Sequence, residues 1–157
     1  MAAIGRILCI SGPNLNLLGK REPAIYGHET LAEIHKRLEA RARSLRVAID
    51  ARQTNHEGVI VDWIGDAAGE GEDGCAGLLL NAGAYTHTSM AIYDALRATS
   101  IPCVEVHVSN PDAREVYRRR SYIARACIGR VAGFGGDSYE LALEGLVRWL
   151  QRDRPRS

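Results

Sequence analysis

The sequence contains only two lysines, and its charge is almost balanced. Eighteen arginines bring the basic residues to 20 against 19 acidic residues, so the net charge of the 157-residue chain is +1. A protein that binds nucleic acid or an anionic membrane mainly through charge carries a large basic excess. The balance therefore argues against both partners. The excess of arginine over lysine has two explanations that the sequence leaves open: a GC-rich coding bias, or arginines that bind a carboxylate through paired hydrogen bonds.

Long hydrophobic runs are missing as well. A helix that crosses a bilayer needs about 20 consecutive apolar residues, and no run in this chain approaches that length. The apolar stretch over residues 4–10 is too short for a signal peptide and is interrupted by Arg6. We therefore expect a cytoplasmic protein with no membrane association.

Cysteine pairs with metal-ligand spacing are also absent. The four cysteines form no Cys-x-x-Cys motif, and Cys9, Cys103 and Cys127 lie in apolar runs. We expect these three to be buried, reduced thiols that pack as small hydrophobic side chains. Neither a disulfide framework nor a metal site is predicted.

What the sequence does contain is an alternation of short apolar runs with amphipathic segments. Five runs have the length and β-branched content of buried strands: residues 6–11, 46–51, 77–80, 102–108 and 127–131. Helical spacing or a capping motif predicts helices over 30–45 and 55–69, from Thr86 or Thr88 onward, from 110 onward, and over 137–150.

This alternation predicts the fold class. Strands that alternate with helices favour an α/β protein with a flavodoxin-like, doubly wound, five-stranded parallel sheet in the order 2-1-3-4-5. We expect one catalytic domain over residues 1–157. Residues 13–29 lack periodicity, and we interpret about 19–28 as a lid over a site. The end of the chain, 151–157, is expected to be frayed and solvated.

Polar residues gather where the predicted strands end. Because the carboxyl ends of parallel strands meet at one edge, where ligands bind to such sheets, we expect an active site there. The residues concerned are Asn14 after the first strand, Asn81 and His87 after the third, and Glu105, His107 and Ser109 at the end of the fourth.

Glu105 and His107 are two apart on one strand, so both side chains point to the same face. A carboxylate beside a histidine fixes the tautomer of the ring and favours the imidazolium form, which prepares a general acid. The alternative is a purely structural contact at the end of a sheet.

Two further groups could serve the same site. Arg114 and Arg118 are four apart and would share one face of the predicted helix, although a solvated basic face has the same pattern. Tyr26, in the lid, follows Arg21 by five residues, and a nearby guanidinium would favour tyrosinate. The alternative for Tyr26 is an ordinary packing role.

The segment over residues 10–27, ISGPNLNLLGKREPAIYG, closely resembles the signature of the type II 3-dehydroquinate dehydratases. The resemblance continues through 53–58, 80–89, 104–110, 114–115, 121–122 and 133–135, in order and with the same spacing. Ser11, Ala84 and the Arg119-Arg120 pair depart from the usual pattern. The resemblance implies cofactor-free trans dehydration of 3-dehydroquinate to 3-dehydroshikimate through an enolate, in the shikimate pathway.

The resemblance also implies catalytic roles. Tyr26, as a tyrosinate stabilised by Arg21, would remove the proton from C2 of the substrate. Asn14 would help to hold a water that stabilises the enolate. His107, oriented by Glu105, would protonate the departing hydroxyl.

The same resemblance implies how the substrate is bound. Asn81 and the backbone amides of Val108 and Ser109 would bind the carboxylate of 3-dehydroquinate. His87 and Arg118 would contact the ring hydroxyls.

Closure and assembly are implied as well. Arg114 would close over the site, and Asp94 would reach into the site of a neighbouring subunit. Family members are typically dodecamers of four trimers, so we expect a homo-oligomer of this kind.

Two other functions compete with this interpretation. A flavodoxin-like mononucleotide-binding module would need a phosphate-cradling loop after the first strand, where Gly12-Pro13 offers few amide donors. Nucleic-acid binding through 114–125 would need interleaved aromatic residues, and only Tyr117 and Tyr122 are present there.

Overall fold

The computed structural model describes residues 4–70 and 74–152. Its five strands form one parallel sheet in the order β2-β1-β3-β4-β5, which confirms the predicted flavodoxin-like topology. The strands are β1 (Arg6–Ser11), β2 (Ala48–Gln53), β3 (Gly77–Asn81), β4 (Cys103–His107) and β5 (Gly129–Ala132). The α-helices are α1 (Pro23–Tyr26), α2 (Leu31–Ser44), α3 (Glu57–Ala67), α4 (Met90–Thr99) and α5 (Asp137–Arg152). Within the described ranges, no helix is both long and apolar enough to cross a bilayer.

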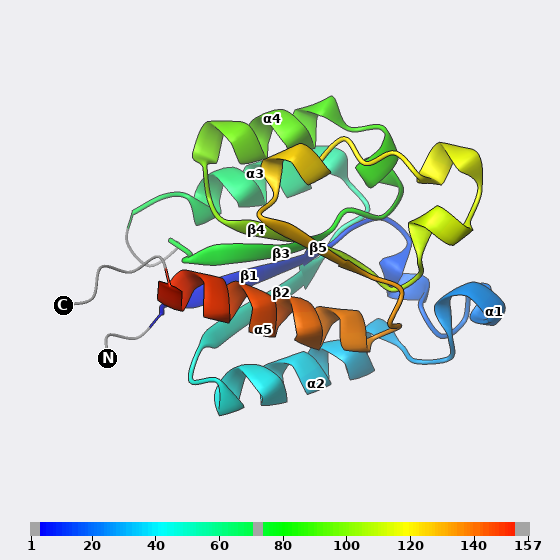
Figure 1. Ribbon diagram of the computed structural model, residues 1–157, viewed down its shortest axis with the longest axis horizontal. Coiled ribbons are helices and arrows are strands. Elements are labelled where there is room, and N and C mark those ends of the chain that lie inside the picture. The colour runs from blue at the N-terminus through cyan, green and yellow to red at the C-terminus, as the bar shows by residue number, and fades with distance from the viewer. Residues whose placement is uncertain (1–3, 71–73, 153–157) are drawn as a thin grey trace.

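The helices form a layer on each side of the sheet. Figure 1 shows α2 and α5 on one face and α3 and α4 on the other. Residues alternate along each strand, so Ile7 and Leu79 pack toward α2 and α5, whereas Leu8 and Leu78 pack toward α3 and α4. Because both faces are covered, the central strands β1, β3 and β4 are buried along almost their whole length.

The start of α2 follows the predicted capping box. Thr30 Oγ1 accepts a hydrogen bond from the Glu33 amide at 3.2 Å, and the Glu33 carboxylate accepts one from the Thr30 amide at 2.8 Å. Leu31, Ile34 and Leu38 then face the core. This box fixes where α2 begins, just after the segment 19–28.

The predicted start of α4 is wrong. Thr86 lies inside a short 3₁₀ helix, η2 (Gly83–His87), and the residue that caps α4 is Ser89, whose Oγ accepts from the Ile92 amide at 3.0 Å. Ser and Thr cap helices by the same chemistry, so sequence alone did not choose among three neighbouring hydroxyls. The consequence is that His87 lies in η2, at the carboxyl edge of the sheet.

The predicted fourth helix is also wrong. The region from 110 to 126 forms three single-turn 3₁₀ helices, η3 (Pro111–Ala113), η4 (Val116–Arg118) and η5 (Ala124–Ala126). Asn110 caps the first of them, but the chain becomes extended again at Arg114. A long helix needs an apolar stripe to bury, and here Val116 and Tyr117 are 74% and 69% exposed.

Smaller differences concern the ends of elements. β2 begins at Ala48 because Arg46 has a positive φ of 59°, which belongs to the preceding turn. β5 begins at Gly129 rather than at the predicted residue 127. Cys9 and Cys103 are buried as predicted, whereas Cys127 is only half-buried. Cys9, Cys103 and Cys127 are free thiols. α5 continues through Arg152, so residues 151–152 are helical rather than frayed, and 153–157 lie outside the described residues.

Candidate active site

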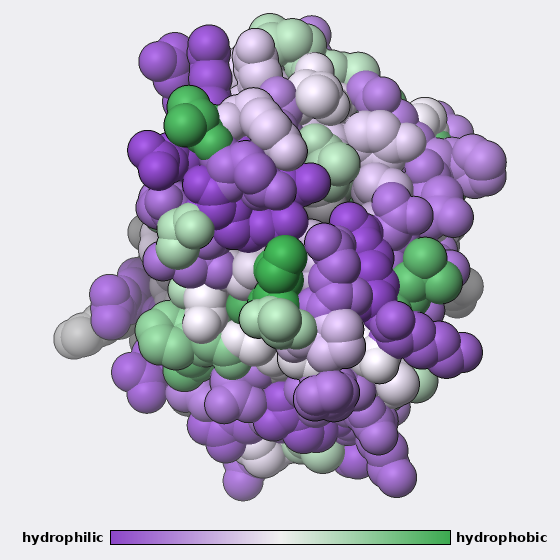
Figure 2. All heavy atoms as spheres, turned by 90° about the vertical axis from the view of Figure 1, so that its right-hand side faces the viewer, coloured by the Kyte–Doolittle hydropathy of each residue, from purple (hydrophilic) through white to green (hydrophobic). Residues whose placement is uncertain are grey.

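The polar residues at the strand ends converge on one cavity. It lies at the carboxyl edge of the sheet, on the side that faces the viewer in Figure 2, where the surface is mainly hydrophilic with scattered hydrophobic side chains. Of the residues predicted for the site, ten line this cavity: Asn14, Arg21, Tyr26, Asn81, His87, His107, Val108, Ser109, Arg114 and Arg118. Glu105 lies next to the cavity through its contact with His107, and Asp94 is exposed on α4.

Glu105 and His107 are adjacent, as their spacing predicted. The Nε2 atom of His107 lies 3.1 Å from Oε2 of Glu105, whose side chain is fully buried. This contact engages one ring nitrogen, and Nδ1 is the nitrogen left for a ligand. The pair can therefore hold a proton next to the cavity and transfer it.

Two residues that sequence reasoning missed also hold Glu105. Ser121 Oγ donates a hydrogen bond to Oε1 of Glu105, and the Nε atom of Arg130 contacts Oε2. Burial by itself would raise the pKa of Glu105, but the contacts with His107 and Ser121 and the charge of Arg130 bring that pKa below its ordinary value. Arg130 stands directly opposite Glu105 because of the register between β4 and β5, which no sequence motif reveals. Ser121 was noticed only as part of the family signature.

Tyr26 is placed in the cavity by α1, a single turn over Pro23–Tyr26 that is followed by Gly27, where φ is 78°. Arg114 Nη1 donates a hydrogen bond to the Tyr26 hydroxyl at 2.8 Å. The guanidinium carbons of Arg21 and Arg114 lie 5.2 and 5.1 Å from the centre of the tyrosine ring. Sequence reasoning paired Tyr26 with Arg21 alone, whereas in the structure Arg21 packs on the ring and Arg114 reaches the hydroxyl.

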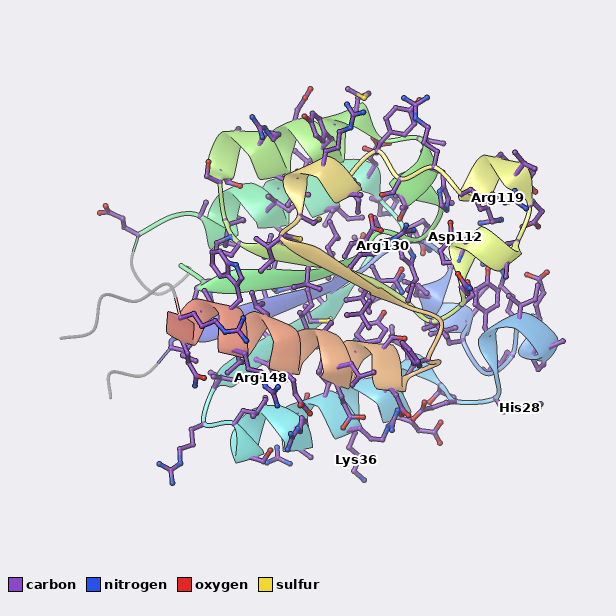
Figure 3. All side chains as sticks on the ribbon, viewed as in Figure 1. His28, Lys36, Asp112, Arg119, Arg130 and Arg148 are labelled. Carbon is purple, nitrogen blue, oxygen red and sulfur yellow. The ribbon has the colours of Figure 1, made fainter. Side chains whose placement is uncertain are left out.

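Arg114 and Arg118 share the cavity although they share no α-helix. Both contact the Glu115 carboxylate, at 3.5 and 3.1 Å. The predicted reason for their proximity is therefore wrong, while the proximity itself is confirmed. Arg119, by contrast, is exposed directly after η4 (labelled in Figure 3) and does not line the cavity.

His87 has a defined tautomer. Its Nδ1 lies 2.7 Å from the carbonyl oxygen of Arg120, so Nδ1 carries a proton and donates it, and Nε2 is left as an acceptor. Burial lowers the pKa of His87, and the charges of His107 and Arg118 lower it further, against the opposing effect of the Arg120 carbonyl. A neutral His87 at pH 7 can therefore accept a hydrogen bond from a hydroxyl group in the cavity.

The lowered pKa of His87 has a measurable consequence for stability. The unfolded chain takes up this proton near pH 6.5, before the folded protein does, so His87 makes the folded state lose stability as the pH falls through that range. We expect the urea midpoint to fall less between pH 7.5 and 5.5 in His87→Gln than in the parent, because glutamine has no such proton. Identical pH profiles of the two proteins would contradict the assignment.

Asn81 is held at the floor of the site by a buried hydrogen-bond network. Its Nδ2 donates to the hydroxyl of Tyr139 at 3.0 Å, and its Oδ1 accepts from the Gly83 amide at 3.2 Å. The same tyrosine hydroxyl lies 2.9 Å from Ser11 Oγ. Tyr139 is fully buried and belongs to the first turn of α5, where sequence reasoning looked only for caps and apolar positions. The network connects β1, β3 and α5 at the cavity.

The loop after β1 uses its amides within the protein. The Gly12 amide donates to the Asn81 carbonyl at 2.8 Å, and the Asn14 amide donates to Oδ1 of Asn55 at 3.0 Å. Asn14 has a positive φ of 65°, which turns the chain sharply into η1 (Leu15–Leu17). Pro13 between them has no amide proton, so this loop offers little to a phosphate group.

No metal centre is found in the part of the chain that the structure describes. No group of three or more histidine, cysteine, aspartate or glutamate side chains there has an arrangement that could hold an ion. The side chains that line the cavity offer one phenol, two imidazoles and three guanidiniums, with amide groups around them.

Comparison with known proteins gives a family match over most of the chain. The family model described as "Dehydroquinase class II" matches residues 5–147. A 3-dehydroquinate dehydratase of Phenylobacterium zucineum is 54% identical over 145 residues, which are 90% of this chain and 97% of the relative.

Solved structures give the same result. The type II dehydroquinase of Butyrivibrio crossotus superposes with a TM-score of 0.86 at 41% identity, covering 90% of this chain and 96% of that one. The type II dehydroquinase of Propionibacterium acnes gives 0.85 at 40% identity, covering 94% and 98%. With a family model that matches nearly all of the chain and relatives of this similarity, the chain belongs to the class II dehydroquinase family.

Proposed function

We propose that the chain catalyses the trans dehydration of 3-dehydroquinate to 3-dehydroshikimate, through an enolate and without a cofactor. The observation that carries this proposal is the meeting of two proton-transfer groups at one cavity. One is Tyr26, contacted by two arginines, and the other is His107, backed by the buried carboxylate of Glu105. Dehydration beside a ketone needs one group that removes a proton and one that donates a proton to the leaving hydroxyl.

Tyr26 is the proposed base. The proton to be removed lies next to a carbonyl, and a phenolate is a stronger base than a carboxylate. Arg114, hydrogen-bonded to the phenol oxygen, and Arg21, packed on the ring, stabilise negative charge on that side chain. The enolate that forms needs hydrogen-bond donors near its oxygen, and Asn14, together with a water molecule that it helps to hold, is the proposed source.

His107 is the proposed acid. The hydroxyl that leaves must take a proton, and an imidazolium next to a carboxylate supplies one. Because Glu105 occupies Nε2, transfer takes place from Nδ1. The contact with Glu105 thus orients the ring and leaves Nδ1 as the proposed proton donor.

The remaining lining residues are proposed to bind the substrate. Asn81 and the backbone of Val108 and Ser109 bind the carboxylate at the end of β4. Neutral His87 accepts a hydrogen bond from a ring hydroxyl, and Arg118 donates to one. This division explains why a protein with a net charge of +1 can bind a small acid, since the site needs local donors rather than overall charge.

A direct assay tests the proposal. The product contains an enone, so ultraviolet absorbance should rise when 3-dehydroquinate is added to protein dialysed against a chelator. Absence of turnover, or turnover only after a metal is added, would contradict it. Visible flavin absorbance in the purified protein would instead favour the mononucleotide-binding alternative, against which the engaged amides of Gly12 and Asn14 already argue.

Covalent catalysis through lysine can be tested in the same preparation. Neither Lys20 nor Lys36 lines the cavity, so no Schiff base with the ketone is expected. Borohydride added together with substrate should leave the activity unchanged. Inactivation with label on either lysine would rule out the enolate mechanism proposed for Tyr26.

We propose further that the chain works in the cytoplasm as a dodecamer of four trimers, with Asp94 reaching the site of a neighbouring subunit. In support, Asp94 is exposed on α4 and lies outside the cavity of its own chain, and Met90 on the same helix is 51% exposed. Light scattering should give a particle roughly twelve times the 17.2 kDa of one chain. A monomer would contradict both the assembly and the role of Asp94.

A further inference from the structure

We propose that Arg130 is a positioning residue for this reaction, which holds the Glu105 carboxylate directed at His107. The proposal rests on the role proposed above for His107. It adds a residue that lies outside the cavity lining and acts on the substrate only through the Glu105–His107 pair.

The geometry around Glu105 supports this assignment. Oε2 of Glu105 is shared between the Nε2 atom of His107, on the same strand, and the Nε atom of Arg130, on the neighbouring strand. Glu105 and Arg130 are paired in the register of β4 and β5, so the contact is set by the sheet itself. Ser121 holds the other carboxylate oxygen. The carboxylate is therefore fixed at both oxygens, and it cannot turn away from His107 without losing a partner.

The titratable and charged groups that interact with Glu105 come from several elements. His107 and Cys103 belong to β4, Arg130 belongs to β5, and His87, in η2, interacts with Glu105 over a longer distance. Only Arg130 among these carries a permanent positive charge. Arg130 therefore offsets the energetic cost of burying the Glu105 carboxylate, whether His107 is protonated or neutral.

This permanent charge has a defined effect on the acid. If Glu105 alone stood beside His107, the full negative charge of the carboxylate would attract the proton of the imidazolium and make it hard to transfer. Arg130 neutralises part of that charge and makes the proton easier to transfer. Arg130 itself is 30% exposed in its side chain, so it reaches the buried carboxylate without being buried completely.

Substitution of Arg130 tests the proposal. Arg130→Gln removes the charge and keeps a hydrogen-bond donor of similar reach. The charge of Arg130 is one of the causes that lower the pKa of Glu105. We therefore expect the titration midpoint of the Glu105 carboxyl, followed by NMR of the ¹³C-labelled side chain, to move upward by about one pH unit. The acidic limb of the kcat profile should move with it, and kcat at neutral pH should fall by about threefold to tenfold. KM should stay within about twofold, because Arg130 does not line the cavity.

Arg148→Gln is the matched control. It removes the same charge from an arginine that is 72% exposed on α5, far from Arg130 in Figure 3. This variant should leave both the titration and the kinetics unchanged. If Arg130→Gln behaves like Arg148→Gln, or if kcat falls while the titration stays where it was, the proposal is overturned.

A second substitution keeps the test decisive if Arg130→Gln does not fold. Arg130→Lys keeps the charge but changes the hydrogen-bond geometry, and it should leave the titration midpoint close to that of the parent. A midpoint shifted as far as one pH unit in the lysine variant would show that charge is not the cause. Because the titration is read in free protein, it separates this proposal from the proposed dehydration, whose failure would appear as absence of turnover in the parent.

Discussion

Tyr26→Phe is expected to lower kcat by roughly 10²- to 10⁴-fold, the range found when a general base is lost. Phenylalanine keeps the ring on which Arg21 and Arg114 pack, but it cannot accept a proton. KM should change little, because the hydroxyl of Tyr26 is proposed to act in proton transfer and not in substrate binding. Absorbance of the enone product gives both constants in one assay.

The controls for Tyr26 lie on the same chain. Tyr93→Phe removes a hydroxyl from α4, outside the cavity, and should retain full turnover. Arg21→Ala should also lose most of kcat, whereas Lys20→Ala, at the neighbouring exposed position, should not. Near-parental turnover of Tyr26→Phe would show that another group is the base.

His107→Gln is the second substitution with a large expected effect, again roughly 10²- to 10⁴-fold in kcat. Glutamine occupies a similar volume and can still donate a hydrogen bond, but it carries no transferable proton. His56→Gln, outside the cavity at the start of α3, is the matched control. Its kinetics should equal those of the parent.

The two variants should differ in hydrogen exchange at C2 of the substrate. In an enolate mechanism, proton removal by Tyr26 precedes protonation of the leaving hydroxyl by His107. In deuterium oxide, His107→Gln should therefore still exchange the C2 hydrogen of 3-dehydroquinate, whereas Tyr26→Phe should not. If both variants lose exchange, or if only Tyr26→Phe retains it, the two roles are assigned incorrectly.

The sequence was most informative where local rules and the fold agree. β1 has the predicted bounds, and α2 begins at the predicted capping box, because a buried apolar run and a Thr-x-x-Glu motif are both decided by near neighbours. The site could be located for a related reason. Once the strands are known to be parallel, Asn81 and His107 must approach one edge.

The sequence was least informative where position depends on packing between distant segments. The region 110–126 has a good helix start at Asn110 but no apolar stripe to continue it, so the start alone was misleading. Arg130 could not be assigned to Glu105, because their pairing depends on strand register. Arg114 meets Tyr26 across 88 residues of sequence, and no local rule relates the two.

Ser11 and Asn81 share the hydroxyl of Tyr139 as a hydrogen-bond partner, so the floor of the site stays intact only while α5 is in place. If the first turn of α5 moved away, the buried groups of Ser11 and Asn81 would lose their partner, at about 1–3 kcal/mol for each. The amide of Gly83, which Asn81 holds, should therefore exchange with solvent through the same opening as the amides of that turn. In this sense α5 and the floor of the cavity form one cooperative unit, although nearly sixty residues of sequence separate Asn81 from Tyr139.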